Sequence, residues 1–388
     1  MQRRHFLAAL AGLPIAMGLP GLARAQTPSR LTVLVYLHGG NDAYNTWVPY
    51  TDPLYRELRP TLAVPRDAVL KVTPTHGFHP SFAPLAPLFE RGELALVQGI
   101  GQPGITQQHY RDCEMVFTGA NEDEFPVDGW AARGLAKLAG APDAVADVAA
   151  FDLLDIRESD PMGPFRGEKQ RVLQIHHPQE LVTGRRVTDC VHEANGPGRA
   201  RLARGVAPIA VPALRTAFGD DQFGQCVRAG VLLAAADPGL RVLHLTLNGH
   251  DGDKHNSVDT HWAQLKWHGD ALSRLAKGLV ALKAGLEEIG RWNDTMVATY
   301  DEFGRSPVEN GEGGTHHGSA TTHFVLGGRV KGGLYGEAPK LLRVHQIGGP
   351  DPVIDTRRLW TTVVSRWWGA DASGVFADRH APLDILKA

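Results

Sequence analysis

Short apolar runs rich in β-branched residues recur along the chain, and glycine or polar residues follow each of them. Uninterrupted runs of this length are typical of strands buried on both faces of a parallel sheet, because a strand with one wet face alternates instead. We therefore predict strands at residues 31–37, 94–98, 171–175, 241–247, 295–300 and 323–326.

A helix is predicted between two of these strands. Apolar residues recur at alternating spacings of three and four, which places them on one face of a helix. They are Leu272, Leu275, Leu279, Leu282, Leu286 and Ile289. Strand, helix and strand in this order form a crossover unit. The expected fold class is α/β, a three-layer sandwich with helices on both faces of a mostly parallel central sheet.

The first residues have the pattern of an export signal. Arg3 and Arg4 precede an apolar stretch, and Ala23-Arg24-Ala25 resembles a cleavage site. The apolar stretch contains glycine and proline and is shorter than the roughly 18 to 20 residues that a spanning helix needs. We predict a cleaved twin-arginine signal peptide at residues 1–25, with an uncleaved anchor as the alternative.

This signal sets the expected location and the domain division. The protein would be exported by the twin-arginine translocase to the periplasm or the cell surface. Residues 26–388 would form one α/β domain, and the stretch at 119–220, rich in Gly, Pro and charge, would be an elaborated connection within it.

Composition narrows the class of partner. The 40 Lys and Arg residues and 42 Asp and Glu residues are interspersed and give a net charge of -2, so nothing favours nucleic acid or anionic lipid. No second apolar stretch is long enough to form a membrane span. Cys113, Cys190 and Cys226 are too few and too scattered for a disulfide framework or a cysteine zinc site, although one bridge with one thiol left over stays open.

Polar clusters follow four of the predicted strands, where ligands of open α/β sheets gather. Asn41 and Asp42 follow the first strand, and Thr106 and His109 follow the second. Taken alone, such residues are equally typical of turns and helix caps. The other two clusters are denser, and they contain His250, Asp251, Asp253, His255, Asp259 and His261, and then Asp301, Glu302, Arg305, His316 and His317. Mixed carboxylate and imidazole ligands suit zinc, manganese or iron, so the convergence predicts a metal site.

An ordered set of short motifs carries a resemblance to a known family. The motifs are GGNDAYNTWVPY, QHYRDCEMVFTG, VDGW, DTHWAQ, DEFGRSPVEN, GGTHHG and LGGRVKGG. Together they resemble the DUF1501 family of exported bacterial proteins, which is similar to the alkaline phosphatase and sulfatase superfamily. The resemblance implies an alkaline phosphatase-like fold, with divalent metals at the sheet edge and cleavage of phosphate or sulfate esters.

Carried over residue by residue, the resemblance implies that one or two zinc or manganese ions are held by Asp42, Asp259, His261, Glu302 and His317. Additional ligands would come from Asn41, Asp251, His255, Asp301 and His316. On spacing alone, Asp251 and His255 would share one face of a helix. The match to the DTH motif favours Asp259 and His261 instead, and leaves the earlier pair in a loop over the site.

The sequence departs from the family pattern where chemistry is expected. Gln108 stands where the family has serine, and His316 stands where it has aspartate. A hydroxyl nucleophile would then come from Thr106, unless a water activated by the metal replaces it. Arg305 would bind an anionic substrate oxygen, and pairing with Glu309 or Asp301 is its alternative. His109 would act as a general acid or orient a ligand.

These observations predict an exported, metal-dependent hydrolase of phosphate, sulfate or related esters on a small molecule or polymer. A non-catalytic metal-binding or recognition protein on a phosphatase-like fold is the alternative, and the missing serine favours it. A carboxylic-ester hydrolase is disfavoured, because the sequence contains no G-x-S-x-G.

Overall fold

The structure, a computed structural model, describes residues 29–138, 147–151, 163–167, 171–175, 178–179, 191–193, 213–247, 258–345 and 347–387. The predicted signal peptide, Cys190 and the candidate ligands Asp251 and His255 lie outside the described residues. Within them, no helix has both the length and the apolar character needed to cross a membrane.

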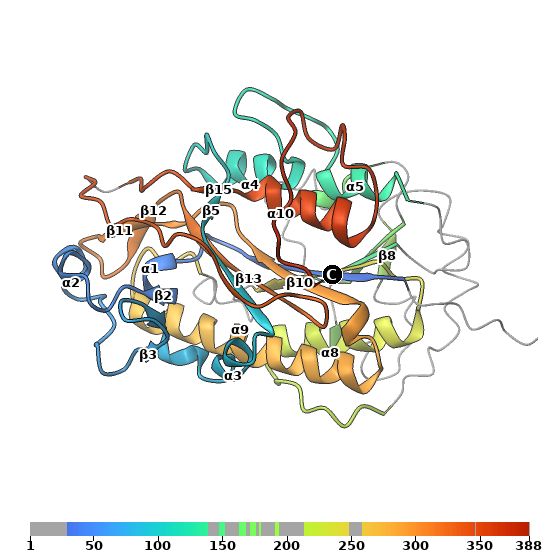
Figure 1. Ribbon diagram of the computed structural model, residues 1–388, viewed down its shortest axis with the longest axis horizontal. Coiled ribbons are helices and arrows are strands. Elements are labelled where there is room, and N and C mark those ends of the chain that lie inside the picture. The colour runs from blue at the N-terminus through green and yellow to red at the C-terminus, as the bar shows by residue number, and fades with distance from the viewer. Residues whose placement is uncertain are drawn as a thin grey trace, which may run out of the picture.

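A ten-stranded sheet forms the middle layer of the fold (Figure 1). Its strand order is β14-β5-β13-β10-β1-β9-β6-β7-β8, with β15 paired to β5. Its strands are β1 (Leu31–Leu37), β5 (Leu94–Gly101), β6 (Val148–Phe151), β7 (Val172–Ile175), β8 (Val191–Glu193), β9 (Val242–Leu247), β10 (Thr295–Tyr300), β13 (Thr321–Gly327), β14 (Gly333–Gly336) and β15 (Ile354–Asp355). The strands predicted from apolar runs are all present, and the prediction of an α/β fold with a mostly parallel sheet is confirmed.

Helices cover both faces of this sheet (Figure 1). One face carries α3 (Ala86–Glu90), α8 (Gln222–Ala236), α9 (Gln264–Glu288) and the 3-10 turns η1 (Pro80–Phe82) and η4 (Trp292–Asp294). The other carries α4 (His109–Thr118), α5 (Trp130–Leu135), η2 (Gly163–Phe165), α10 (Thr356–Thr361) and the π-helical segment η5 (Thr362–Trp367). The arrangement has three layers.

The residues of β1 alternate between two hydrophobic cores. Val33 and Val35 pack on the side of α8 and α9, whereas Leu34 and Tyr36 pack on the side of α4 and α10. Every residue of the strand is buried. Both faces of this central strand must therefore be apolar, which explains the uninterrupted run in the sequence.

The predicted crossover unit is present as β9, α9 and β10. Strand β1 lies between β9 and β10 and pairs with both of them in parallel, so α9 carries the chain across β1. Leu272, Leu275, Leu279 and Leu282 of α9 are buried in the core on that side. The Leu-rich face is therefore the face that packs on the sheet.

Strand β13 is an antiparallel member of the mostly parallel sheet. It pairs antiparallel with both β10 and β5. The chain leaves β10 into an antiparallel hairpin, β11 (Arg305–Glu309) and β12 (Thr315–His317), with no crossover helix before β13. Parallel neighbours need a crossover connection, usually a helix, so the returning strand runs the opposite way.

Smaller elements shape the loops beyond the carboxyl ends of the strands. The strands β2 (Trp47–Val48), β3 (Leu70–Lys71) and β4 (Gly77–Phe78) form a three-stranded antiparallel sheet. The short helices α1 (Ala43–Thr46) and α2 (Pro53–Leu58) lie in the same region. The hairpin pairs Arg305 with His317. Two candidate site residues therefore lie opposite each other in one small ladder.

Candidate metal centre

The described residues that follow β1, β5, β9 and β10 meet at one edge of the central sheet, and after β9 these begin at residue 258. Strands β1, β9 and β10 are mutually parallel, and β5 runs in the same direction because β13 is antiparallel to both β10 and β5. The four polar clusters of the sequence follow these strands. Their convergence at the carboxyl edge is the arrangement that open α/β sheets use for ligands.

Four side chains from three of these clusters bring potential metal-ligand atoms together. His109, Asp259, His261 and His317 each offer one such atom, and these atoms lie within 4.8 Å of one another. His261 Nε2 is 3.1 Å from Asp259 Oδ1 and 3.0 Å from His317 Nε2. His109 Nε2 is 3.6 Å from Asp259 Oδ2. The group is compact enough for a single divalent ion.

The outer nitrogens of two imidazoles show that the group fits a metal. His317 Nδ1 donates to the main-chain oxygen of Gln107 at 2.6 Å, because a carbonyl can only accept. Burial and the Arg305 guanidinium lower the pKa of His317 to about 4, so its Nε2 carries a lone pair at pH 7. Metal-binding histidines usually donate their other N–H to a carbonyl or carboxylate in this way.

Glu302 fixes the ring of His109. Its carboxylate is buried and accepts from His109 Nδ1 at 2.8 Å, from the backbone N–H of Gly39 at 2.9 Å and from the Tyr36 hydroxyl at 3.0 Å. Burial acts to raise the pKa of Glu302, but the hydrogen bond from His109 and the charges of His38 and His109 together lower it. Glu302, predicted as a ligand, therefore lies behind His109 and turns His109 Nε2 toward the group.

The protonation of His109 and Asp259 depends on their mutual contacts. Burial acts to lower the pKa of His109, but hydrogen bonds to Asp259 and Glu302 raise it to about 9. Burial acts to raise the pKa of Asp259, but His109, His261 and Arg305 hold it well below the usual range. The group therefore contains one firmly ionised carboxylate, and a cation bound at His109 Nε2 would displace a proton.

Arg305 is saturated by contacts within the protein. Its Nε donates to the oxygen of Gly40 at 3.0 Å, and Nη1 donates to the oxygen of Thr315 at 3.1 Å and contacts His261 Nε2 at 3.4 Å. Its Nη2 donates to the oxygen of Gly39 and to Asp259 Oδ1. Four of the five N–H groups of this guanidinium donate to oxygen atoms, and the fifth faces His261 Nε2. Arg305 therefore holds Asp259 and the turn at Gly39 and Gly40 in place. The structure gives it these contacts within the protein instead of the predicted contact with a substrate oxygen.

The structure does not bring Asp42 into the group. Asp42 Oδ2 pairs with Arg59 Nη1 at 2.5 Å and also accepts from Gln264 Nε2, while Oδ1 accepts from the backbone N–H of Tyr44 at 3.0 Å as the N-cap of α1. The side chains of Asp42 and Arg59 are fully buried. Burial acts to raise the pKa of Asp42, but Arg59 lowers it. The ion pair occupies the carboxylate predicted to bind metal.

The remaining predicted residues lie around the group. Asn41 Oδ1 accepts from Thr46 Oγ1 and His268 Nε2, both at 3.0 Å. Asp301 accepts from the backbone N–H of Asn41 at 3.0 Å, and burial raises its pKa well above the usual range. The ring of His316 lies 5.8 Å from that of His261, and its side chain is partly exposed.

The start of α4 is held by a carboxylate of its own. Thr106 donates its backbone N–H and its hydroxyl to Asp112 Oδ1, at 2.7 and 2.9 Å, and Gln108 donates its backbone N–H to Oδ2 at 3.0 Å. The hydroxyl predicted as a replacement nucleophile is thus bound to Asp112. Gln108 is the N-cap of α4, and its side chain makes no capping hydrogen bond.

Sequence reasoning missed Tyr36 and Gln107, which position the group, and Arg59, which pairs with Asp42. Tyr36 belongs to a predicted strand, and its hydroxyl was overlooked because the residue counts as part of an apolar run. Gln107 has φ +62°, a left-handed conformation that non-glycine residues seldom adopt, and this conformation presents its carbonyl to His317. Nothing in the local sequence marks it. Arg59 is detectable only through its contact with Asp42.

Comparison with known proteins gives a family match over part of the chain and a set of similar folds. Residues 210–351 match the family described as "Protein of unknown function (DUF1501)". The match covers Asp259, His261 and His317, and less than half of the chain. No curated protein matches the chain.

Several solved structures resemble the fold at low identity. The lipoteichoic acid synthase LtaP from Listeria monocytogenes is 13% identical with a TM-score of 0.43, over 90% of this chain and 74% of that chain. The C-terminal periplasmic domain of EcEptC from Escherichia coli, in complex with Zn, is 10% identical with a TM-score of 0.39, over 77% and 73%. Phosphonoacetate hydrolase from Sinorhizobium meliloti 1021 is 14% identical with a TM-score of 0.30, over 72% and 57%. Likeness at this level does not extend to function.

Proposed function

We propose that this chain is an exported, metal-dependent hydrolase of phosphate, sulfate or related esters, and that His109, Asp259, His261 and His317 hold its divalent ion. The observation that carries the proposal is the group itself, four potential ligand atoms within 4.8 Å of one another from segments far apart in sequence. Two of its rings donate their outer N–H to fixed acceptors, as expected for metal ligands.

The donor set favours zinc or manganese. Three imidazoles and one carboxylate are ligands that these metals accept, whereas calcium and magnesium prefer oxygen. When bound, such an ion can polarise an ester oxygen and lower the pKa of a water to about 7. The protein's own contribution is orientation. Glu302 fixes His109 through Nδ1, Gln107 fixes His317 through Nδ1, and Arg305 fixes Asp259.

Export is part of the same proposal. We assign residues 1–25 to a twin-arginine signal and residues 26–388 to one domain that acts in the periplasm or at the cell surface, on an ester of a small molecule or polymer. Membership of the whole chain in the DUF1501 family, and the relation of that family to alkaline phosphatases and sulfatases, are proposed with it.

The first experiment measures metal content. The mature protein is loaded with zinc or manganese, dialysed and analysed by mass spectrometry, as wild type and as His317→Ala, Asp259→Ala and His316→Ala. We expect about one ion per chain in the wild type, loss in the first two variants, and retention in His316→Ala, the matched control next to His317. Metal content below stoichiometry that His317→Ala leaves unchanged would overturn the proposed site.

The second experiment separates the roles of His109 and tests catalysis. We expect His109→Ala to lower metal content, because His109 Nε2 belongs to the group. If metal is retained while turnover of phosphate and sulfate esters is lost, His109 is a proton donor instead. Metal binding with no turnover across phosphate, sulfate and carboxylate esters would select the second candidate function, a metal-binding recognition protein. Gln108 in place of the family's serine favours that candidate.

A further inference from the structure

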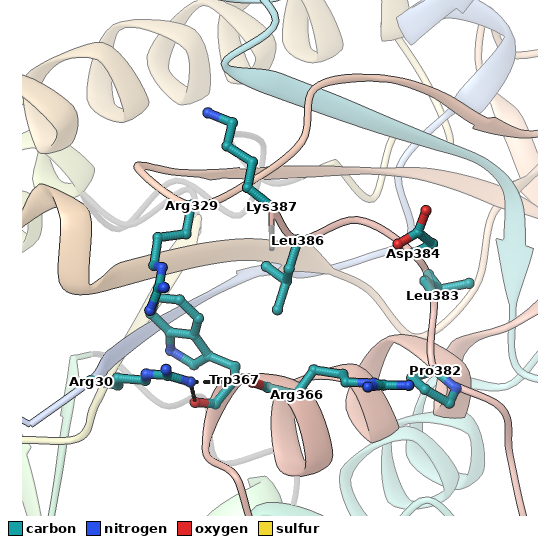
Figure 2. Close-up of a pocket in the computed structure, with 9 residues that line it drawn as sticks. All are labelled: Arg30, Arg329, Arg366, Trp367, Pro382, Leu383, Asp384, Leu386 and Lys387. Carbon is teal, nitrogen blue, oxygen red and sulfur yellow. Dashed lines mark hydrogen bonds between the residues drawn. The ribbon is translucent and has the colours of Figure 1, made fainter.

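A cavity lies at the opposite edge of the central sheet from the metal group. Its volume is about 460 Å³, and its lining consists of Arg30, Arg329, Arg366, Trp367, Pro382, Leu383, Asp384, Leu386 and Lys387 (Figure 2). Arg30 immediately precedes β1, and the loop after β1 reaches the metal group. At about 3.3 Å per residue, the strand holds the two sites about 23 Å apart. The cavity is therefore separate from the proposed metal centre.

The charges of the lining are unbalanced. Asp384 is its only carboxylate, and it pairs with Lys331 outside the lining, at 2.9 Å. Within the part of the chain that the structure describes, no carboxylate pairs with any of the four cationic lining residues. Like charges around a concave surface raise the local concentration of anions. A bound anion would neutralise the unpaired positive charges of this cavity.

Main-chain carbonyls hold two of the four cations in place without neutralising them. Arg30 Nη1 donates to the oxygens of Arg366 and Trp367, at 3.2 and 2.6 Å, and Lys387 Nζ donates to the oxygen of Gly328 at 3.3 Å. The side chains of Arg329 and Arg366 have no hydrogen-bond or ion-pair partner among the described residues. Two guanidinium groups are therefore available to a ligand, each able to bind an oxyanion through two N–H groups.

Apolar side chains form the rest of the wall. Trp367 is only 1% exposed and lies under the Arg30 guanidinium, with 5.2 Å from the guanidinium carbon to the ring centroid. Leu383 is buried, and Pro382 and Leu386 are partly exposed. Pockets of about 300 to 1,000 Å³ with apolar walls and a few charged groups are typical of small-molecule sites. The concave shape and this lining suit a compact ligand better than a flat anionic surface.

We propose that this cavity binds a small organic anion that carries a phosphate or sulfate group on an apolar body. Arg329 binds the oxygens of the anionic group, and Arg30, Arg366 and Lys387 add positive charge around the lining. Pro382 and Leu386, which are partly exposed, contact the body. The site is independent of the metal group and does not require its catalysis.

Calorimetric titration of the mature protein with phenylphosphonate tests the site. Chelator is present throughout so that no metal occupies the other edge, and the salt concentration is low because exposed charges are screened by salt. We expect saturable binding that weakens at least about tenfold in Arg329→Glu, which loses charge-assisted hydrogen bonds, and by a smaller factor in Arg366→Glu, which reverses one charge of the lining. Benzyl alcohol, which has no charge, should not bind.

Two controls assign the binding to this cavity. Arg56→Glu reverses an exposed charge on α2 and should leave the affinity unchanged, and His317→Ala should do the same. Thermal unfolding confirms that each variant is folded, and the two arginine variants test the site independently. Absent binding, wild-type affinity in Arg329→Glu, or loss of binding in His317→Ala would overturn the proposal. Binding to vesicles of anionic phospholipid without binding of phenylphosphonate would also overturn it.

Discussion

The buried pair of Asp42 and Arg59 offers the sharpest test of how the predicted site residues divide into roles. Both side chains are fully buried, and Arg59 also donates to Asn45 Oδ1 at 3.0 Å and to the oxygens of Pro307 and Ser306 at 2.9 and 2.6 Å. The pair therefore ties the loop after β1 to strand β11. Its loss should affect folding more than metal binding.

The expected magnitude follows from burial. Asp42→Asn keeps the shape of the side chain but leaves the Arg59 charge without its counter-ion, and breaking a fully buried pair costs about 3–5 kcal/mol of unfolding free energy. Arg59→Met should cost at least as much, because it also leaves two carbonyls without a donor. In the double variant neither charge remains, so we expect the combined loss to fall short of the sum by about 2 kcal/mol or more.

Urea unfolding at pH 7 of the wild type, both single variants and the double variant measures these free energies. Metal content of the same samples is determined in parallel, with His317→Ala as the comparison. We expect Asp42→Asn to retain its metal and His317→Ala to lose it. An Asp42→Asn variant that matches the wild type within about 0.5 kcal/mol would contradict the stabilising role of the pair, and one that loses its metal while remaining folded would show that Asp42 is a ligand.

Three further results are expected. Tyr36→Phe removes one donor from the buried glutamate behind the metal group and should weaken metal affinity roughly tenfold in a chelator competition assay; an unchanged affinity would show that the hydroxyl has no positioning role. Gln107→Gly keeps the carbonyl in its left-handed conformation and should preserve metal affinity, whereas Gln107→Val should lower stability by about 1–2 kcal/mol and weaken the metal in the same assay; equal behaviour of the two variants would contradict the role of this backbone conformation. Burial lowers the pKa of His244 to about 3, so below pH 6.5 the unfolded chain takes up a proton at this residue and the folded chain does not. The stability that neutral His244 contributes is complete above pH 6.5 and is lost as the pH falls toward 3, by about 2 kcal/mol at pH 5. His244→Gln should therefore narrow its stability gap to the wild type by that amount between pH 8 and pH 5 in urea unfolding, and a gap independent of pH would show that the folded state accepts the proton.

The fold followed closely from local pattern. Strand β1 lies between layers of helices and is buried on both faces, so its residues had to be apolar without interruption, and its bounds were predicted as residues 31–37. The face of α9 that packs on the sheet had to repeat at helical spacing. The direction of β13 was not predictable in this way, because antiparallel and parallel strands buried on both faces have the same pattern.

The position of the candidate site was also largely predictable. Polar residues directly after parallel strands meet at one edge of the sheet. The sequence therefore predicted Asp259, His261 and His317 as members of one site. It did not distinguish them from Asp42 or Glu302, which follow strands of the same sheet and have the same chemistry. A carboxylate's role depends on which groups lie within hydrogen-bond distance, and these groups cannot be identified from the residue type.

The sequence by itself determined the α/β class, the strands and helices with strong periodicity, and the edge of the sheet where acidic and imidazole groups gather. Only the tertiary structure decided that Arg59 neutralises Asp42, that Glu302 orients His109, and that cations from the beginning and end of the described chain line one cavity. The physical reason is that hydrophobic periodicity is set locally, residue by residue, whereas compensation of charge is set by distance in space between residues far apart in the chain.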